Sequence, residues 1–212
     1  MNRRFLLTTA TAALVSSSLG LTAALAQDTA AADQDAGVQI TEMVLGNPDA
    51  TVEVIEYASF TCPHCANFHA NQFKEIKKNY IDTGKIKFVY REIYFDRFGL
   101  WASMIARCGG EMRYFGIADM IYEKQREWTA GGDPVVIADN LRNIGKVAGL
   151  SDADLDACMQ DGEKAQALVS WFEENSTRDE IASTPSFMIN GEKYSNMSYE
   201  DFASLLDKAL EG

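Results

Sequence analysis

The sequence predicts an α/β fold in which two parts of one sheet domain flank a long helical insertion. Residues 51–93 alternate between strand-like and helix-like patterns, and residues 187–210 have the pattern of a hairpin followed by a helix. The chain between these parts has helical periodicity and little strand character. We therefore expect one domain from residues 40–95 and 179–212, with a helical domain at 96–178.

The first part of the sheet domain is expected to be a βαβ unit. A strand over residues 40–45 ends at a Gly-Asn-Pro-Asp turn cluster, and residues 51–57 form the next strand. A helix-like segment follows, and residues 85–93 then alternate as a strand. This order implies two parallel strands joined by a right-handed crossover.

The last part is expected to be a hairpin and a helix. Asn190-Gly191 favours a tight turn between strand-like residues 187–189 and 192–194. Ser198 is placed to cap the final helix, with Asp201 three residues later as in a capping box. The order βαβ and then ββα resembles the thioredoxin arrangement, so the predicted fold class is a thioredoxin fold with an inserted helical domain.

Four helices are expected in the insertion, separated by glycine-containing turns. Ser151 with Asp154 three residues later has the pattern of a capping box, which marks the start of the fourth. The expected helices cover residues 100–108, 112–128, 134–148 and 155–175.

The motif Cys62-Pro63-His64-Cys65 carries the chemistry, because it places two thiols one helical turn apart between a strand and a helix. Pro63 suits the first helical position, so Cys62 falls at the helix N-terminus, where unpaired N–H groups and the helix dipole lower the pKa of a thiol. His64 adds a donor beside the same sulfur. Since a thiolate exists only in the reduced state, stabilising it makes the disulfide easier to reduce and the protein a stronger oxidant.

A metal site is the main alternative for this motif. His69 follows Cys65 by four residues, which gives a C-x-x-C-x-x-x-H string on one helical face. A structural zinc site needs four ligands, however, and the chain has two other cysteines and no histidine besides His64 and His69. We therefore expect no metal and no cofactor, and we interpret His69 as an ordinary surface or core-edge histidine. A c-type haem site would need histidine where Ala66 stands.

The first residues indicate export. Residues 1–26 combine a basic start, an apolar stretch and an Ala-Leu-Ala end, which is the pattern of a secretory signal peptide cleaved after Ala26. Residues 27–39 are rich in Ala, Asp and Gln and are expected to be flexible. Cleavage removes two arginines and no acid, so the formal charge changes from −12 to −14. Such an acidic protein is not expected to bind nucleic acid or anionic lipid.

Together, export, the C-P-H-C motif, the helical insertion and Thr184-Pro185 before a hairpin resemble the DsbA family of periplasmic thiol:disulfide oxidoreductases, in particular its alphaproteobacterial-type branch. The resemblance implies a redox-active Cys62–Cys65 disulfide, with Cys62 as the exposed nucleophile and Cys65 as the buried resolving thiol. It also implies that Thr184-Pro185 is a cis-proline loop that offers its backbone to a substrate strand. An ordinary turn proline is the alternative for Pro185.

The resemblance also assigns roles to three further residues outside the motif. Glu56 matches the family's buried acidic position, from which a carboxylate could relay the proton of Cys65, and strand alternation turns Glu56 inward. An exposed edge position is the alternative. Cys108 and Cys158 are expected to form a structural disulfide, as in other members of the resembled branch and in keeping with export. Two buried free thiols are the alternative.

The predicted function is an exported enzyme that introduces disulfides into newly secreted proteins, through a mixed disulfide at Cys62 that Cys65 resolves. The expected partners are unfolded or reduced exported proteins and a membrane redox partner of the DsbB type. A periplasmic disulfide isomerase or reductase is the first alternative, but only residues 27–39 precede the expected domain, which favours a monomeric oxidase. A non-catalytic metal-handling or chaperone module is the second.

Overall fold

The computed structural model describes residues 37–212, which lie within one compact unit. The signal peptide expected at residues 1–26 and most of the flexible segment expected at 27–39 lie outside the described residues. Over the described range, no helix has both the length and the apolar character needed to cross a bilayer.

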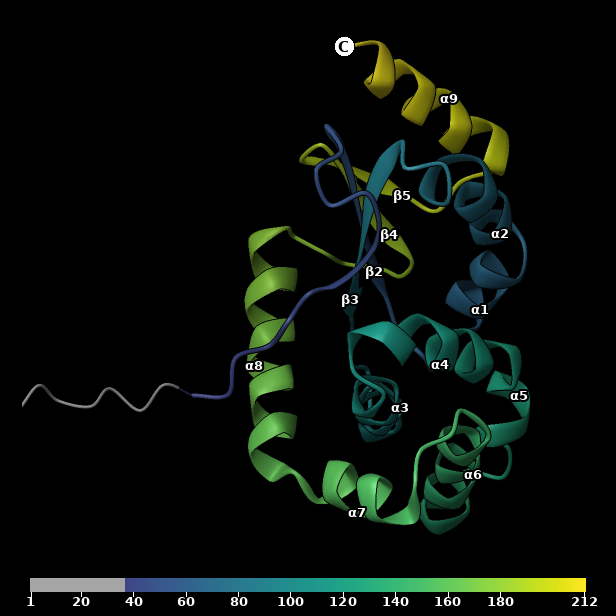
Figure 1. Cartoon of the computed structure of the whole chain (residues 1–212), viewed down its shortest axis with the longest axis vertical. Coiled ribbons are helices and arrows are strands. Elements are labelled where there is room, and N and C mark those ends of the chain that lie inside the picture. The colour runs from purple at the N-terminus through teal and green to yellow at the C-terminus, as the bar shows by residue number, and fades with distance from the viewer. Residues whose placement is uncertain (1–36) are drawn as a thin grey trace, which may run out of the picture. The chain divides into compact units, whose positions relative to one another are not determined.

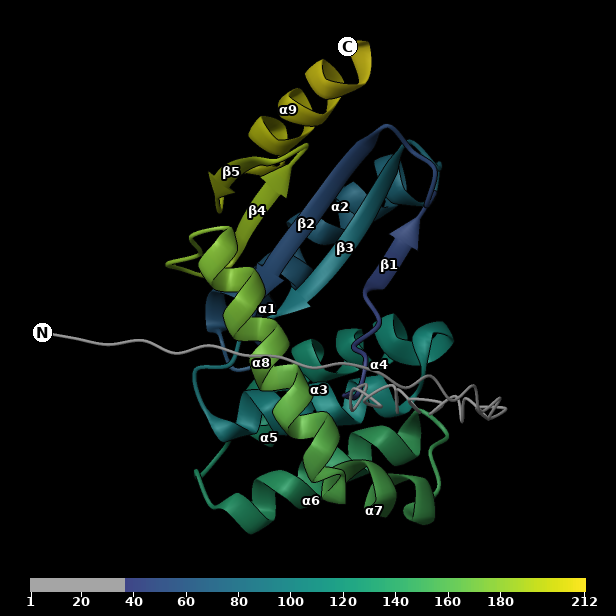
Figure 2. The ribbon, with the colours of Figure 1, turned by 90° about the vertical axis from the view of Figure 1, so that its left-hand side faces the viewer.

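A five-stranded mixed sheet forms the centre of the fold (Figure 2). The strands lie in the order β1-β3-β2-β4-β5, and β2 and β3 are parallel whereas the other pairs are antiparallel. This topology confirms the predicted thioredoxin fold. The strands are β1 (Met43–Gly46), β2 (Val52–Ala58), β3 (Ile86–Glu92), β4 (Ser186–Ile189) and β5 (Glu192–Ser195).

Two turns of the sheet contain residues with positive φ angles, and the residue types present there suit those angles. β1 begins three residues later than expected and ends at Gly46, whose φ is 84° and where a Cβ would lie 2.4 Å from the carbonyl oxygen of Ile86. Asn190 and Gly191 have φ of 47° and 84°, the two positive values that a type I′ hairpin turn requires. The predicted hairpin is therefore confirmed.

Different helices bury the two faces of β2. Figures 1 and 2 show α8 (Gly162–Arg178) against one face of the sheet and α1 (Pro63–Ala70) on the other. Because successive strand residues point to opposite faces, Tyr57 packs toward α8, where its hydroxyl donates to the Asn175 carbonyl, whereas Glu56 points toward α1. The face of β2 that carries Glu56 therefore lies directly behind α1, the helix that begins at the cysteine motif.

The α1 side of the sheet is completed by three further segments. α2 (Gln72–Ile76) and a π-helical turn, η1 (Lys77–Ile81), continue from α1 toward β3. α9 (Tyr199–Glu211) begins at Ser198, whose side chain accepts from the Asp201 N–H as predicted, and it packs beside α2.

The helical insertion matches the predicted pattern in part. Its first and third helices lie close to the expected bounds, and the second divides at Lys124. The helices of this region that precede α8 are α3 (Arg97–Cys108), α4 (Glu111–Glu123), α5 (Gln125–Trp128), α6 (Pro134–Val147) and α7 (Asp152–Gln160).

The prediction of one continuous helix over residues 155–175 is wrong. The structure has α7 and α8 there, separated at Asp161, whose carboxylate accepts a 2.8 Å hydrogen bond from the Lys164 N–H and so begins a new helix. α7 itself begins at Ser151, which forms a reciprocal capping box with Asp154. The capping signal was correct, and the break came from a second cap inside an otherwise helical pattern.

A buried polar contact joins the sheet to the insertion. Arg107 of α3 donates from Nε and Nη2 to the two carboxylate oxygens of Glu92, each at 2.7 Å, and the Tyr114 hydroxyl donates to the same carboxylate at 2.8 Å. A paired, bidentate geometry of this kind satisfies charges that would otherwise be costly to bury. The boundaries between residues 95 and 96 and between 178 and 179 stay predictions.

Candidate active site

The two cysteines of the motif lie where β2 passes into α1. Cys62 is the N-cap of α1 and Pro63 occupies its first turn, as the sequence predicts. Cys65 is fully buried. Cys62 was expected to be exposed, but its side chain is only 7% exposed because the Thr184 loop covers it, with the Thr184 carbonyl oxygen 3.6 Å from Sγ. Both thiols are unbonded, so this is the reduced arrangement.

The two thiols differ sharply in acidity. The pKa of Cys62 is lowered from 9.0 to about 5, chiefly by a hydrogen bond from the Cys65 thiol and further by Thr184 and by the backbone N–H groups of Cys65 and His64. Burial opposes this shift but does not cancel it. Burial raises the pKa of Cys65 far above its ordinary value, and the negative charges of Cys62 and Glu56 raise it further. At neutral pH the pair therefore consists of one thiolate and one thiol.

His64 contributes to this site through its backbone. Its side chain is exposed, and among residues 37–212 the imidazole has no hydrogen-bond partner, so the side-chain donor expected beside Cys62 is not observed. The donor that reaches Cys62 is the His64 N–H, one of the unpaired groups at the start of α1.

Thr184-Pro185 lies directly opposite the cysteines. The peptide bond between them is cis, Pro185 is buried, and β4 begins at the next residue. The loop therefore places a backbone carbonyl beside Sγ of Cys62.

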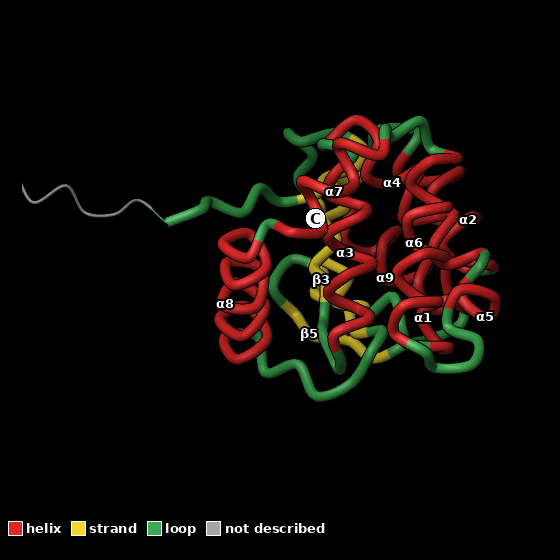
Figure 3. Tube along the Cα trace, turned by 90° about the horizontal axis from the view of Figure 1, so that it is seen from below, coloured by secondary structure: helices red, strands yellow, loops and turns green. Residues whose placement is uncertain are grey.

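Gln125 supports the cysteine loop from the insertion and was missed by sequence reasoning. Its Nε2 donates to the carbonyl oxygens of Phe60 at 2.8 Å and of Cys62 at 2.9 Å, and the side chain is 5% exposed. Figure 3 shows α5, which begins with Gln125, beside α1. No local pattern marks this residue, since its partners lie more than sixty positions earlier in the chain.

Glu56 and His69 form a buried pair behind Cys65. Glu56 is fully buried, which excludes the exposed alternative, and His69 is 6% exposed. Nε2 of His69 lies 3.1 Å from Oε1 and 3.0 Å from Oε2 of Glu56. The interpretation of His69 as an ordinary surface or core-edge histidine is wrong. Two signals could have found the pair: His69 is four residues after Cys65 on the same helical face, and alternation turns Glu56 inward.

A groove of about 560 Å³ opens beside this pair, between the α1 side and the α4–α5 side of the molecule. Its lining is mixed: the α1 side contributes basic side chains, and the α4–α5 side contributes acidic side chains together with Arg126. It includes Pro63, His69, Gln125, Lys74, Asp119 and Tyr122.

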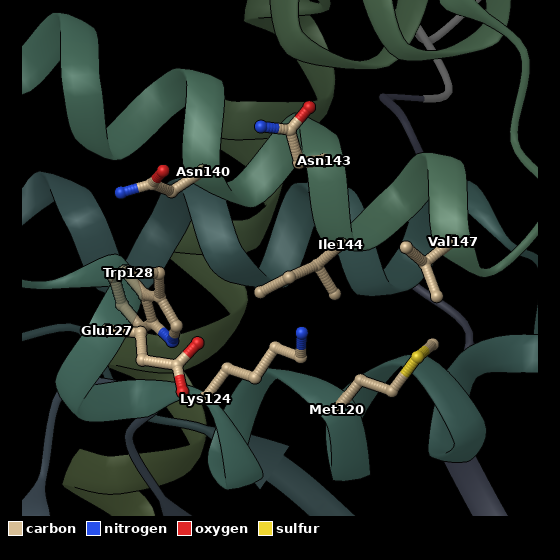
Figure 4. Close-up of a pocket in the computed structure, with 8 residues that line it drawn as sticks. All are labelled: Met120, Lys124, Glu127, Trp128, Asn140, Asn143, Ile144 and Val147. Carbon is tan, nitrogen blue, oxygen red and sulfur yellow. The ribbon is translucent and has the colours of Figure 1, made fainter.

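A second hollow of about 160 Å³ lies between α4, α5 and α6 (Figure 4). Figure 4 shows Met120 and Lys124 on one wall with Ile144 and Val147 on the other. No residue of the cysteine motif lines it.

Cys108 and Cys158 are joined by a disulfide that links α3 to α7. The bond closes a loop with a sequence separation of 50 residues. It holds two helices of the insertion together and shares no residue with the groove or the cysteine motif.

The chain is similar to proteins whose names refer to disulfide chemistry. A protein of Rickettsia bellii named a protein-disulfide oxidoreductase is 35% identical over 171 residues, covering 80% of this chain and 65% of the relative. Disulfide bond formation protein D of Bacillus subtilis is 24% identical over 183 residues, covering 80% of this chain and 77% of that protein. The chain thus spans less than two thirds of the Rickettsia relative's length.

Solved structures agree with these relatives. The crystal structure of Wolbachia pipientis alpha-DsbA1 has a TM-score of 0.76 and 27% identity, and the match covers 83% of this chain and 94% of that one. This likeness confirms the DsbA resemblance inferred from the sequence. A family model described as thioredoxin matches residues 38–208. The chain belongs to the thioredoxin family.

Proposed function

We propose that the chain is an exported protein-disulfide oxidoreductase that donates its Cys62–Cys65 disulfide to reduced proteins outside the cytosol. The observation that carries the proposal is the opposite acidity of two thiols one helical turn apart: the pKa of Cys62 is about 5, while burial keeps Cys65 protonated. A thiolate that is stable at neutral pH is a good leaving group, so substrate disulfides form readily as Cys62 is released.

The reaction proceeds in two exchange steps. A substrate thiolate attacks Sγ of Cys62, the bond to Cys65 breaks, and the electron pair leaves on Cys65, which takes up a proton. A second substrate thiolate then attacks the substrate sulfur of the mixed disulfide, and Cys62 leaves as a thiolate. The substrate dithiol loses two electrons and the enzyme disulfide gains them. In the reverse direction, Cys65 resolves the mixed disulfide.

Substrate recognition is assigned to the loop opposite the cysteines. The Thr184 carbonyl lies 3.6 Å from Sγ of Cys62, so an extended segment paired with residue 184 would hold its cysteine at the reacting sulfur. Backbone pairing reads no particular side chain, which suits a protein that acts on many unfolded polypeptides. A membrane partner of the DsbB type would reoxidise the dithiol in the periplasm.

The test is disulfide transfer to a reduced, unfolded protein with two cysteines, in the absence of other oxidants. We expect one substrate disulfide for each Cys62–Cys65 pair consumed, and none from Cys62→Ser. Reduced Cys65→Ser, mixed with the disulfide-bonded product, should retain a mixed disulfide at Cys62 because its resolving thiol is missing. The matched control is the double variant Cys108→Ser and Cys158→Ser, which should still transfer. Transfer by Cys62→Ser would refute the proposal.

A further inference from the structure

The proposed exchange requires a proton to reach a site that is closed to water. Cys65 is fully buried, and its pKa is raised by that burial, so the sulfur must gain a proton when the disulfide opens and lose it when the disulfide reforms. Glu56, the nearest assigned acid, is also fully buried. A further group must therefore connect Glu56 to solvent.

His69 has the geometry of that connection. One ring nitrogen, Nε2, lies 3.0 and 3.1 Å from the two carboxylate oxygens of Glu56. The other, Nδ1, is buried and has no hydrogen-bond partner among the described residues, although His69 lines the groove of about 560 Å³. An imidazole with one nitrogen on a buried acid and the other beside a groove can take a proton on one side and release it on the other.

The packing around His69 holds the ring in place. The Tyr122 ring stacks on it with 4.3 Å between centroids and 18° between planes, and Tyr90 approaches its edge at 6.0 Å. Burial raises the pKa of both tyrosines well above 10, so neither exchanges protons near neutral pH. Neutral aromatic side chains therefore hold the imidazole ring in place. Among the contacts described here, Glu56 is the buried acid that the ring touches.

The charged groups that face His69 come from every wall. Glu56 of β2 is in direct contact, and Asp119 of α4 lies in the groove, where burial raises its pKa and a positive His69 lowers it. The remaining charged groups of the groove are Lys74 of α2, Lys77 of η1, Glu123 of α4, and Arg126 and Glu127 of α5. Among these groups, Asp119 is the acid whose pKa responds to the charge of His69.

We propose that His69 is a positioning residue that orients Glu56 and carries protons between it and the groove beside α1. The inference rests on the proposed exchange at Cys62 and Cys65. When Cys65 leaves the disulfide, Nδ1 takes a proton from groove water, Nε2 gives its proton to Glu56, and the carboxylic acid gives its proton to the Cys65 thiolate. Reoxidation reverses each transfer, so the ring returns to its starting tautomer and no proton accumulates.

The test separates the step that needs this route from the step that does not. Reduced protein reacts with oxidised glutathione first through the Cys62 thiolate, which forms a mixed disulfide and releases glutathione. Cys65 must then lose its proton, attack Sγ of Cys62 and release the second glutathione. Acid quenching at successive times, followed by mass spectrometry of the intact protein, gives both rates.

In His69→Asn, whose amide can donate to Glu56 but cannot carry a proton, we expect an unchanged first step. The second step should slow by about a hundredfold or more, the lower end of the range that general acid–base catalysis contributes, so the mixed disulfide accumulates. His69→Phe, which keeps an aromatic ring against Tyr122, should behave alike. Imidazole added to His69→Ala should restore the second step in proportion to its concentration. Lys74→Ala, on the wall of the same groove, is the matched control and should leave both steps unchanged.

An unchanged second step in His69→Asn and His69→Phe would overturn the relay. Equal slowing of both steps would also overturn it, because loss of packing around α1 would slow both. Failure of the native protein to convert the mixed disulfide into a Cys62–Cys65 bond would overturn the proposed function together with the relay, and the two failures are therefore distinguishable.

Discussion

Nε2 of Gln125 lies 2.9 Å from the carbonyl oxygen of Cys62 and donates a hydrogen bond to it from the far side of the cysteine loop. The same nitrogen donates to the Phe60 carbonyl at 2.8 Å. The helical insertion therefore contributes directly to the active site, because one of its side chains donates to two carbonyl groups of the segment that presents the nucleophile.

Replacing Gln125 with Ala should destabilise the protein. The change leaves the buried Phe60 carbonyl oxygen without its donor, and an unsatisfied group of this kind costs about 1–3 kcal/mol. The Cys62 carbonyl loses one of its two donors and still accepts from the Ala66 N–H at 3.1 Å. Urea unfolding of the reduced protein measures the loss. Gln166→Ala, at an exposed position of α8, is the matched control and should have little effect. Equal stability of the two variants would show that the Gln125 contacts contribute nothing.

The stability of the reduced protein should increase with pH through Cys62. A thiol whose folded pKa is about 5 and whose unfolded pKa is near 9 stabilises the fold fully above pH 9, and this contribution disappears as the pH falls to 5. Between those limits the slope is roughly 1.4 kcal/mol per pH unit. The difference in unfolding free energy between the native protein and Cys62→Ser should therefore grow by roughly 3 kcal/mol from pH 5.5 to 7.5. A constant difference would contradict the low pKa.

Removing the Cys65 thiol should raise the pKa of Cys62. The hydrogen bond from Cys65 is the largest cause of the low value, so in Cys65→Ala the thiolate loses its main donor. Thiolate absorbance at 240 nm, followed against pH, gives the midpoint directly. A midpoint still near 5 in this variant would mean that the backbone groups at the start of α1 suffice without the thiol.

Replacing His64 with Ala should have a smaller effect on the same midpoint. The imidazole is exposed and forms no hydrogen bond within the described residues, whereas the backbone N–H that reaches Cys62 survives the substitution. The pKa of Cys62 should therefore stay below that in Cys65→Ala. If His64→Ala moves the midpoint further than Cys65→Ala does, the imidazole is the main determinant.

The bond between Cys108 and Cys158 should support the fold without taking part in exchange. Closing a loop of 50 residues stabilises the folded state by roughly 4 kcal/mol on the chain-entropy account. The double variant Cys108→Ser and Cys158→Ser should lose stability of that order, measured by urea unfolding, and keep the Cys62 midpoint. Alkylation of unfolded, unreduced native protein should leave both positions unmodified, and their modification would refute the bond.

The parts that the sequence predicted well depend on neighbours in the chain. Residues within four positions of one another determine three kinds of feature: the Asn190-Gly191 turn, the caps at Ser151 and Ser198, and the position of Cys62 at the start of α1. Such features can be predicted from the sequence because the groups that interact are close together in the chain.

The parts that it missed depend on contacts between distant segments. His69 meets Glu56 across the gap between α1 and β2, and Gln125 reaches the Cys62 loop from the insertion. A lone histidine or glutamine has no pattern of its own, and its role exists only once the sheet and helices are packed. The break between α7 and α8 at Asp161 was missed for another reason. The apolar periodicity continues across Asp161, so the pattern does not show that Asp161 caps a second helix.

The central claim, that Cys62 and Cys65 donate a disulfide to substrates, is tested most directly by their reduction potential. Equilibration with glutathione redox buffers and counting of the free thiols at Cys62 and Cys65 gives the value. Because the pKa of Cys62 is about 5, we expect a potential far less negative than the roughly −270 mV of thioredoxin, toward the roughly −120 mV of a strong oxidant. A value near −270 mV would contradict an oxidase and favour a reductase.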